Sequence, residues 1–213
     1  MMARMITLHG HPYSPNSRKV HWALEEMGAP YVYKTVNLAT REQKSPEFLR
    51  LNPNGRVPVV VDGEGDNGFV LYESNAILWY LADKYDHGHI VPEDLAERAL
   101  IDQWMWWQAS DLAPATGRPW IMKFYHTRFG APFDGDKHQH MVQAAASPLL
   151  LLDQHLATRK FVVGERFTIA DIALSEFFGL CSEAGIPLGE VPHVSAWFAR
   201  LADRPAFRKT RPA

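Results

Sequence analysis

Strand-like and helix-like hydrophobic patterns alternate along the first part of the chain. Short runs rich in apolar, β-branched or aromatic residues predict four strands, at residues 5–9, 31–36, 59–61 and 69–71. Apolar residues at helical spacing predict helices at residues 17–27, 45–51 and 74–85. The predicted order is therefore βαβαββα, which is typical of a layered α/β domain.

The strand signal ends after this part, and only helical patterns follow. They occupy residues 93–108, 139–158, 169–184 and 194–203, and the second is expected to be interrupted at Pro148. Residues 110–138 have an irregular pattern that predicts no definite element. The polar residues 86–92 contain Gly88 and Pro92 and predict a linker. We therefore expect an α/β domain at residues 1–85, a linker at 86–92 and an all-helical domain at 93–213.

Composition narrows the class of protein. Of the 213 residues, 46% are hydrophobic and 22% are charged, values that exclude disordered and fibrous chains. The net charge of −2, without a basic stripe, argues against a nucleic-acid partner. No leader and no run of about 18 apolar residues is visible, so we expect a cytoplasmic protein that does not enter a membrane. Cys181 is the single cysteine, which excludes a disulfide framework and a two-cysteine redox motif.

The first candidate site is the segment GHPYSPNSRKV at residues 10–20, between the first strand and the first helix. Ser14 can donate its hydroxyl hydrogen to an anion held near the helix N-terminus. The alternative is that Ser14, Asn16 and Ser17 only form a turn and cap the helix. Taken alone, the segment favours that structural interpretation.

The second candidate is Arg56-Val57-Pro58-Val59, where a proline enters an apparently central strand. Proline cannot donate a ladder hydrogen bond, so the position predicts a bulge or a cis bond. The backbone of Val57 would then be available to pair with an extended peptide ligand. An ordinary proline at a strand entry explains the sequence equally well.

The third candidate is Glu73-Ser74, directly before a predicted helix. Ser74 lies where an N-cap belongs, and capping is its structural interpretation. In a functional interpretation this helix end binds a carboxylate, and Glu73 accepts hydrogen bonds from an ammonium group. A ligand with both groups is an amino acid or the end of a peptide.

A fourth motif, Phe167-Thr168-Ile169-Ala170-Asp171-Ile172, has a structural explanation. Thr168 and Asp171 stand in the N-cap and N3 positions of a capping box, and Phe167 and Ile172 suit a hydrophobic staple. We expect this motif to start a core helix without touching substrate.

Together, and in this chain order, the four motifs resemble the cytosolic glutathione transferase superfamily over about residues 5–205. The loop ending in Ser14 is similar to the serine-type phi and theta classes. Ser14-Pro15-Asn16 with Lys19 also resembles the nu class, which has Thr-Pro-Asn there. The catalytic cysteine of the beta class has no counterpart, because Cys181 lies far away in the helical half, and the zeta-class motif is missing.

The resemblance implies a thioredoxin-like domain followed by a helical bundle, and a homodimer. It implies that Ser14 hydrogen-bonds the sulfur of the substrate glutathione and favours the thiolate. Catalysis would need no metal, and the pairs His87/His89 and His138/His140 lack supporting carboxylates or cysteines. Further implied glutathione-binding residues are Asn16, Gln43, Lys44, Arg56, Val57, Pro58, Glu73 and Ser74. A hydrophobic second substrate is expected to meet one or two of Trp107, Leu112 and Trp120.

Three functions are compatible with these residues. The first is transfer of glutathione to hydrophobic electrophiles, and the second is reduction of disulfides or peroxides by bound glutathione, as in nu-class relatives. The third is a glutathione-binding regulatory protein without catalysis, because one fold hosts many functions. The presence of the whole residue set argues against the third.

Overall fold

A four-stranded mixed sheet organises the first part of the chain, in the order β2-β1-β3-β4. The computed structural model describes residues 5–63 and 68–212, so the predicted turn at 63–68 lies mostly outside the described residues. β1 runs parallel to β2 and antiparallel to β3, and β3 pairs antiparallel with β4. All four predicted strands are present. They are β1 (Ile6–Gly10), β2 (Tyr31–Thr35), β3 (Val59–Asp62) and β4 (Phe69–Tyr72).

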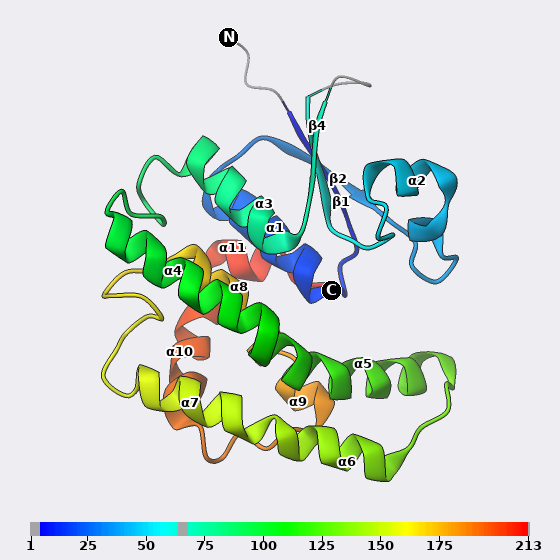
Figure 1. The fold of residues 1–213 in the computed structure, drawn as a ribbon, viewed down its shortest axis with the longest axis vertical. Helices are drawn as coiled ribbons and strands as arrows, with labels where there is room; N and C mark the ends of the chain where they lie inside the picture. The colour runs from blue at the N-terminus through cyan, green and yellow to red at the C-terminus, as the bar shows by residue number, and fades with distance from the viewer. Residues whose placement is uncertain (1–4, 64–67, 213) are drawn as a thin grey trace. The chain divides into compact units, whose positions relative to one another are not determined.

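Helices cover both faces of this sheet, with α1 and α3 together on one face and α2 on the other (Figure 1). The side-chain alternation of the strands explains the two layers. Val60 joins the core beneath α1 and α3, whereas its neighbour Val59 joins Phe48 of α2 on the opposite face. The helical elements are α1 (Pro15–Glu26), η1 (Glu42–Lys44), α2 (Pro46–Leu51), α3 (Ser74–Leu81) and the π-helical turn η3 (Ala82–Asp86).

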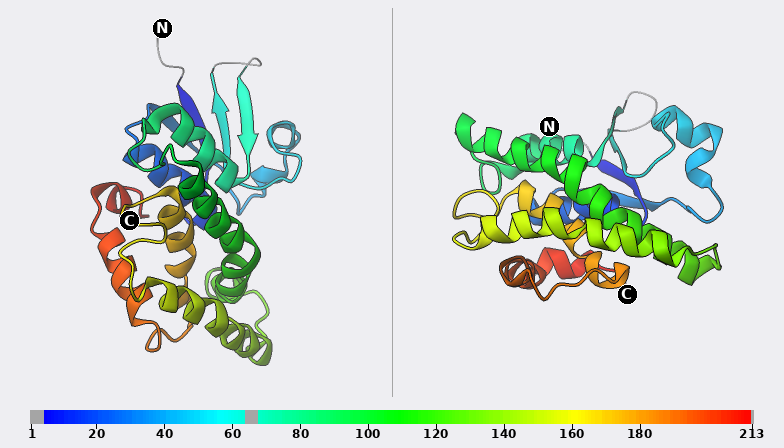
Figure 2. Two further views of the ribbon diagram at one scale, coloured as in Figure 1. Left: turned by 60° about the vertical axis from the view of Figure 1, so that its left-hand side comes forward. Right: turned by 60° about the horizontal axis from the view of Figure 1, so that its bottom comes forward.

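The second part of the chain is helical throughout its regular elements, as predicted. Figures 1 and 2 show α4 and α5 following one another through a π-helical turn, with α6 and α7 running alongside. α8 is buried at every position, as expected for a helix at the centre of a bundle. The elements are α4 (Leu95–Trp107), η4 (Gln108–Leu112), α5 (Ala113–Phe129), α6 (Gly135–Ala144), α7 (Ala146–Leu156), α8 (Ile169–Phe178), α9 (Cys181–Ala184) and α10 (Pro192–Ala202).

Residues 110–138, for which the sequence pattern predicts no element, are largely helical in η4, α5 and the start of α6. The prolines do not prevent this. Pro114 lies in the first turn of α5, where its missing N–H has no intrahelical partner, and Pro119 is accommodated inside the helix. The π-helical turn η4 allows α4 and α5 to continue with little break.

The interruption predicted at Pro148 lies instead at Ala145, between α6 and α7. Pro148 is in the first turn of α7, a position that tolerates proline. The capping box predicted at Thr168 and Asp171 is confirmed. The Thr168 side chain accepts a hydrogen bond from the backbone of the first helical turn, and the Asp171 side chain accepts one from the Thr168 backbone. Asp171 also accepts hydrogen bonds from the Val162 amide (2.9 Å) and the Trp197 indole (2.8 Å).

The chain divides into two compact units, Met1–Val91 with Arg204–Ala213, and Pro92–Asp203. The final residues therefore belong with the first unit, although the sequence pattern places them with the helical domain. They carry α11 (Pro205–Lys209), whose Phe207 ring packs edge-on against Trp22 of α1 at 5.0 Å. Arg204 forms a two-pronged ion pair with Glu26 at 2.7 and 2.8 Å. A five-residue helix has too weak a pattern to reveal such a partner in the sequence.

Candidate active site in the first unit

The strand register brings the predicted loops to one end of the sheet. His9 pairs with Val59, and Val59 pairs with Tyr72. The loop after β1, the residues entering β3 and the residues leaving β4 therefore lie at the same end of the sheet. β2 is parallel to β1, with Gly10 opposite Thr35. The segment after β2, which carries Gln43 and Lys44, therefore starts from the same end of the sheet.

Ser14 is the N-cap of α1, and its Oγ accepts a hydrogen bond from the Ser17 amide at 3.3 Å. The capping role that the sequence suggested is thus present. A serine hydroxyl also has one hydrogen to donate, and no described residue accepts it. The O–H group stands at the positive end of a twelve-residue helix, where a negative charge is stabilised.

The first turns of α1 and α3 are joined by side-chain hydrogen bonds. Ser74 Oγ donates to Asn16 Oδ1 at 3.1 Å, and Lys19 Nζ donates to Asn75 Oδ1 at 2.8 Å. Both Ser74 and Lys19 are buried. Two predicted site residues, Asn16 and Ser74, are therefore in direct contact, and Lys19 supports the same junction.

Gln43 and Lys44 lie against the turn that precedes Val57. Lys44 Nζ donates to the Asn54 carbonyl at 3.0 Å. Gly55 has a φ of +57°, and an added Cβ would lie 2.7 Å from both the Gln43 carbonyl oxygen and Lys44 Nζ. Gln43 Oε1 is buried and has no hydrogen-bond partner among the described residues, which is an uncommon state for an amide oxygen.

Asn52 organises the same turn and was not singled out by the sequence analysis. Its Nδ2 donates to the Arg56 carbonyl at 2.8 Å, and its Oδ1 accepts from the Asn54 amide at 3.0 Å. The sequence contains the signal for this role, because an asparagine before Pro-Asn-Gly commonly forms hydrogen bonds with the backbone of its own turn.

The Val57–Pro58 bond is cis, as the sequence suggested. β3 begins at Val59, and no described residue hydrogen-bonds the backbone of Val57. Pro58 is buried, whereas Arg56 is exposed. The N–H and C=O groups of Val57 are therefore available to an extended ligand.

Glu73, and not Ser74, is the N-cap residue of α3, and Ser74 is the first helical residue. Glu73 has a φ of +71° and its side chain makes no capping bond. A left-handed conformation in a non-glycine residue is uncommon and is concentrated at ligand-binding sites. Here it accompanies an exposed carboxylate at the start of a helix.

The histidines of the first loop region are held neutral by their surroundings. Burial lowers the pKa of His11, and burial, with a smaller effect of Lys34, lowers the pKa of His9. His11 Nδ1 accepts a hydrogen bond from the Tyr13 amide at 3.3 Å. Both rings therefore help to shape the loop without adding positive charge near neutral pH.

Gly10 begins the first candidate segment, but the sequence analysis gave it no role of its own. A Cβ on Gly10 would lie 2.8 Å from Tyr33 Oη and 3.2 Å from Ser17 Oγ. Burial raises the pKa of Tyr33 to about 12, so its phenol remains protonated. Because Gly10 has no side chain, the Tyr33 phenol can lie against its backbone at the start of the first loop.

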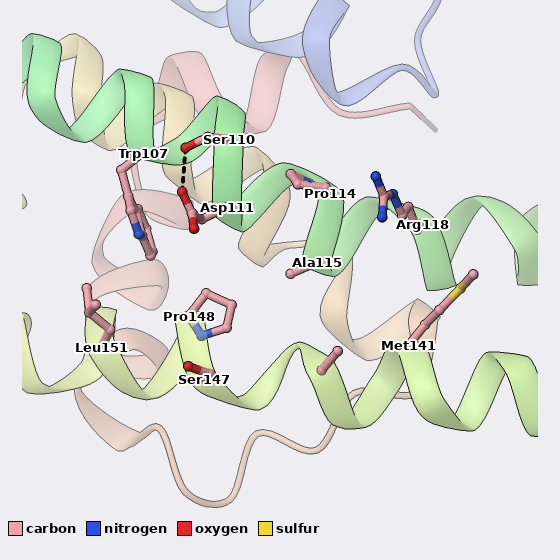
Figure 3. Close-up of a pocket in the computed structure, with 11 residues that line it drawn as sticks. Trp107, Ser110, Asp111, Pro114, Ala115, Arg118, Met141, Ser147, Pro148 and Leu151 are labelled. Atoms are coloured by element: carbon pink, nitrogen blue, oxygen red, sulfur yellow. Dashed lines mark hydrogen bonds between the residues drawn. The ribbon is translucent and has the colours of Figure 1, made fainter.

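The tryptophans of the helical unit have different environments. Trp107 lines a pocket of about 450 Å³ between α4–α5 and α6–α7, with Leu151 near it and Arg118 and Met141 at the other end (Figure 3). Leu112 is fully buried. Trp120 is buried and donates its indole N–H to Glu183 at 2.8 Å. Of the three residues expected to meet a second substrate, only Trp107 lines this pocket.

The described residues contain no group of three or more His, Cys, Asp or Glu side chains arranged to hold a metal ion. Cys181 is buried in the second unit, and burial raises the pKa of its thiol to about 12. Within the described ranges, no helix is long and apolar enough to cross a membrane.

Two family models match this chain. Residues 13–84 match the glutathione S-transferase N-terminal domain, and residues 118–205 match the glutathione S-transferase C-terminal domain. Glutathione S-transferase 1 of Schizosaccharomyces pombe is 34% identical, covering 96% of this chain and 94% of the relative. The disulfide-bond oxidoreductase YfcG of Escherichia coli is also 34% identical, covering 95% and 92%.

A solved structure is similarly close. The glutathione transferase family member from Pseudomonas fluorescens, determined with two glutathione bound, has a TM-score of 0.84 and 34% sequence identity, covering 96% of this chain and 91% of that chain. The chain therefore belongs to the glutathione S-transferase family of enzymes, with the thioredoxin-like and helical domains that the family resemblance implied.

Proposed function

We propose that the first unit binds glutathione and that the Ser14 hydroxyl stabilises the glutathione thiolate. The observation that carries this proposal is the geometry of Ser14, whose Oγ caps α1 while its hydrogen has no acceptor among the described residues. A hydrogen bond from this O–H to sulfur, together with the helix N-terminus, favours the charged form and lowers the thiol pKa.

The remaining groups match the rest of the peptide. The backbone of Val57 pairs with the cysteinyl residue, and the Glu73 carboxylate receives the γ-glutamyl ammonium. The start of α3 at Ser74 receives the γ-glutamyl carboxylate. Lys44 supplies the positive charge for the glycyl carboxylate, and the neighbouring Gln43 binds the same end of the peptide. We propose that Arg56 is an additional cation for the glycyl end of glutathione.

The leading reaction is transfer of glutathione to a hydrophobic electrophile. The thiol proton leaves to solvent, and the sulfur then forms a bond to an electrophilic carbon while the leaving group departs with its electron pair. Trp107 is our candidate contact for the electrophile, because it is half-buried and lines the pocket in Figure 3. We propose in addition that the protein forms a homodimer.

A second candidate is reduction of disulfides by two glutathione molecules. One glutathione thiolate attacks a sulfur of the disulfide and releases half of the substrate as a thiolate. A second glutathione thiolate then attacks the glutathione sulfur of the mixed disulfide, which releases the other half of the substrate as a thiolate and gives oxidised glutathione. Two observations favour this candidate. The oxidoreductase of E. coli is as similar as the transferase of S. pombe, and the related P. fluorescens structure holds two glutathione molecules.

The test is an ultraviolet titration of the thiolate of bound glutathione, with wild type and Ser14→Ala. We expect a bound-thiol pKa below that of free glutathione, with the shift lost in Ser14→Ala. Ser45→Ala is the matched control, because Ser45 caps α2 with a 3.2 Å bond from the Phe48 amide and lies outside the thiol site. It should lose a similar cap energy and keep the pKa shift.

The same variants, assayed on an aromatic halide and on a small disulfide, separate the two reactions. Turnover of the halide supports the transferase, and turnover of the disulfide alone supports the reductase. Asn16→Ala should impair the reductase more than Ser14→Ala if Asn16 replaces Ser14 in thiol activation. Glutathione binding with an unshifted thiol pKa would contradict the proposal and indicate a non-catalytic binding protein.

A further inference from the structure

A second cavity lies in the helical unit, between the end of α7 and one face of α10, and has a volume of about 600 Å³. None of the proposed glutathione-binding residues lines it. Four of its eight lining residues are basic, and they come from both segments. These are Arg159 and Lys160, which follow α7, and His193 and Arg200 on α10.

The permanent cations of this cavity form no ion pair within the described part of the chain, although Lys160 Nζ lies 5.6 Å from the centre of the Phe161 ring. No carboxylate is among its lining residues, and no ion pair in the described part of the chain involves Arg159, Lys160 or Arg200. By contrast, Arg166 of the same unit pairs with Glu97 at 2.7 Å. Three permanent cations around one hollow, in a chain of net charge −2, create a local field that attracts anions.

Backbone carbonyls orient the two guanidinium groups. Arg159 Nη1 donates to the His155 carbonyl, and Arg200 Nη2 donates to the Lys160 carbonyl, both at 2.9 Å. Ordinary helix capping and loop bracing explain these two bonds. Each occupies one of the five N–H groups of a guanidinium, and the others can form paired hydrogen bonds with an oxyanion.

The N-terminus of α10 is not the source of this attraction. The His193 and Val194 amides donate to Asp153 Oδ1 at 2.8 and 2.9 Å, so the buried Asp153 already satisfies that helix end. The charge that faces the cavity therefore comes from side chains.

Small residues keep the cavity open between the charged groups. His193, Ala196 and Arg200 lie at i, i+3 and i+7 on α10, which places them on one helical face. Ala196 separates the two basic side chains there, and Ala157 lies on the opposite side of the hollow. The resulting space exceeds what a single phosphate or carboxylate group needs.

We propose that this cavity is a binding site for a small polyanion that carries at least two phosphate or carboxylate groups. Two arginines suit the paired oxygen atoms of either group, and Lys160 adds a further charge. The cations come from two segments, the residues after α7 and the helix α10, so a ligand with two anionic groups can contact side chains of both segments at once.

The experiment is isothermal titration calorimetry of the full chain with inorganic pyrophosphate and with citrate, at an ionic strength held constant with sodium chloride. We compare wild type with the cavity variant Arg159→Gln/Lys160→Gln/Arg200→Gln. The matched control is Lys123→Gln/Arg128→Gln/Lys137→Gln, which removes the same charge from the same unit outside the cavity. We expect the cavity variant to lose at least about tenfold in affinity and the control to stay within about twofold.

A steric variant keeps the test independent of net charge. Ala196→Trp obstructs the hollow between the two segments and retains all four basic side chains, so it should also weaken binding. Circular dichroism and the glutathione thiol titration show that each variant is folded. Tighter binding of pyrophosphate assigns the site to phosphates, and tighter binding of citrate assigns it to carboxylates. The proposal fails if neither ligand binds wild type, if both triple variants lose affinity equally, or if Ala196→Trp binds normally.

Discussion

Ser74 Oγ donates a 3.1 Å hydrogen bond to Asn16 Oδ1 and so joins residues that are 58 positions apart in the sequence. The bond connects the first turns of α1 and α3. The start of each helix carries a residue that we assign to a different part of glutathione. Ser14 at α1 is assigned to the central cysteinyl thiol, and Ser74 at α3 is assigned to the γ-glutamyl end. The contact therefore fixes the spacing between two parts of the proposed site.

This contact predicts an energetic coupling between Asn16 and Ser74. Asn16→Ala and Ser74→Ala should each lower the free energy of unfolding, and the double variant should lose less than the sum by about 1 kcal/mol. Urea denaturation of the four proteins measures the cycle. Strict additivity would show that the hydrogen bond does not stabilise the junction.

Gly55→Ala should lower stability and glutathione binding more than the replacement of another glycine with positive φ. The new Cβ meets the Gln43 carbonyl oxygen and Lys44 Nζ at 2.7 Å, so the loop or the lysine must move. Gly28→Ala is the matched control, because Gly28 has a φ of +60° and no atom within 4 Å of its added Cβ. We expect Gly28→Ala to cost about 1 kcal/mol in stability.

Gly55→Ala should cost at least about 1 kcal/mol more than this control and weaken glutathione binding, measured by equilibrium dialysis. Equal stability losses and an unchanged dissociation constant in both variants would show that the turn does not position Lys44.

Asp171→Ala should strongly destabilise the helical unit. Its carboxylate accepts bonds from the Val162 and Thr168 amides and from the Trp197 indole, and the variant leaves these buried donors unpaired. We expect a loss of about 3 kcal/mol or more. Asp153→Ala removes a carboxylate that accepts from two amides, and it should cost less. Thermal or urea unfolding ranks the two, and the reverse order would contradict this account.

The same residue predicts a pH dependence. Burial raises the pKa of Asp171 to about 6, above its value of about 3.9 in unfolded chains. The folded state then binds more protons between these pH values, so the contribution of Asp171 to stability falls as pH rises from about 4 to about 6. The stability difference between wild type and Asp171→Ala should shrink over this interval by up to about 3 kcal/mol. A difference that grows with pH would refute the assignment.

Cys181 should take no part in glutathione chemistry. Its thiol is buried and its pKa is raised to about 12, so the thiolate fraction at about pH 8 is very small. Native protein should resist a thiol reagent such as iodoacetamide, whereas protein unfolded in guanidinium chloride should be labelled fully. Mass spectrometry measures both states, and Cys181→Ala should retain the glutathione-dependent activities. Rapid labelling of the native protein would show that the thiol is accessible.

Local sequence signals predicted several features whose cause is local. The four strands are seen in the alternation and β-branched content of short runs, and the capping box is seen because Thr168 and Asp171 are three residues apart. Local signals also mislead for local reasons. Pro148 suggested a helix interruption, but the first turn of α7 accepts a proline, and the break falls at Ala145. Residues 110–138 gave no pattern because a π-helical turn and the prolines obscure the period of 3.6 residues.

The sequence by itself determined the βαβαββα order of the first domain, the all-helical character of the second part and the residue types at the proposed thiol site. Only the tertiary structure decided which of these residues meet. It placed Asn16 on Ser74, set Gln43 and Lys44 against Gly55, and returned α11 to the first unit. It also gathered the cations that follow α7 and the basic residues of α10 around one cavity. Periodicity and capping act over a few residues, whereas these contacts depend on strand register and helix packing between distant segments, which no short stretch of sequence encodes.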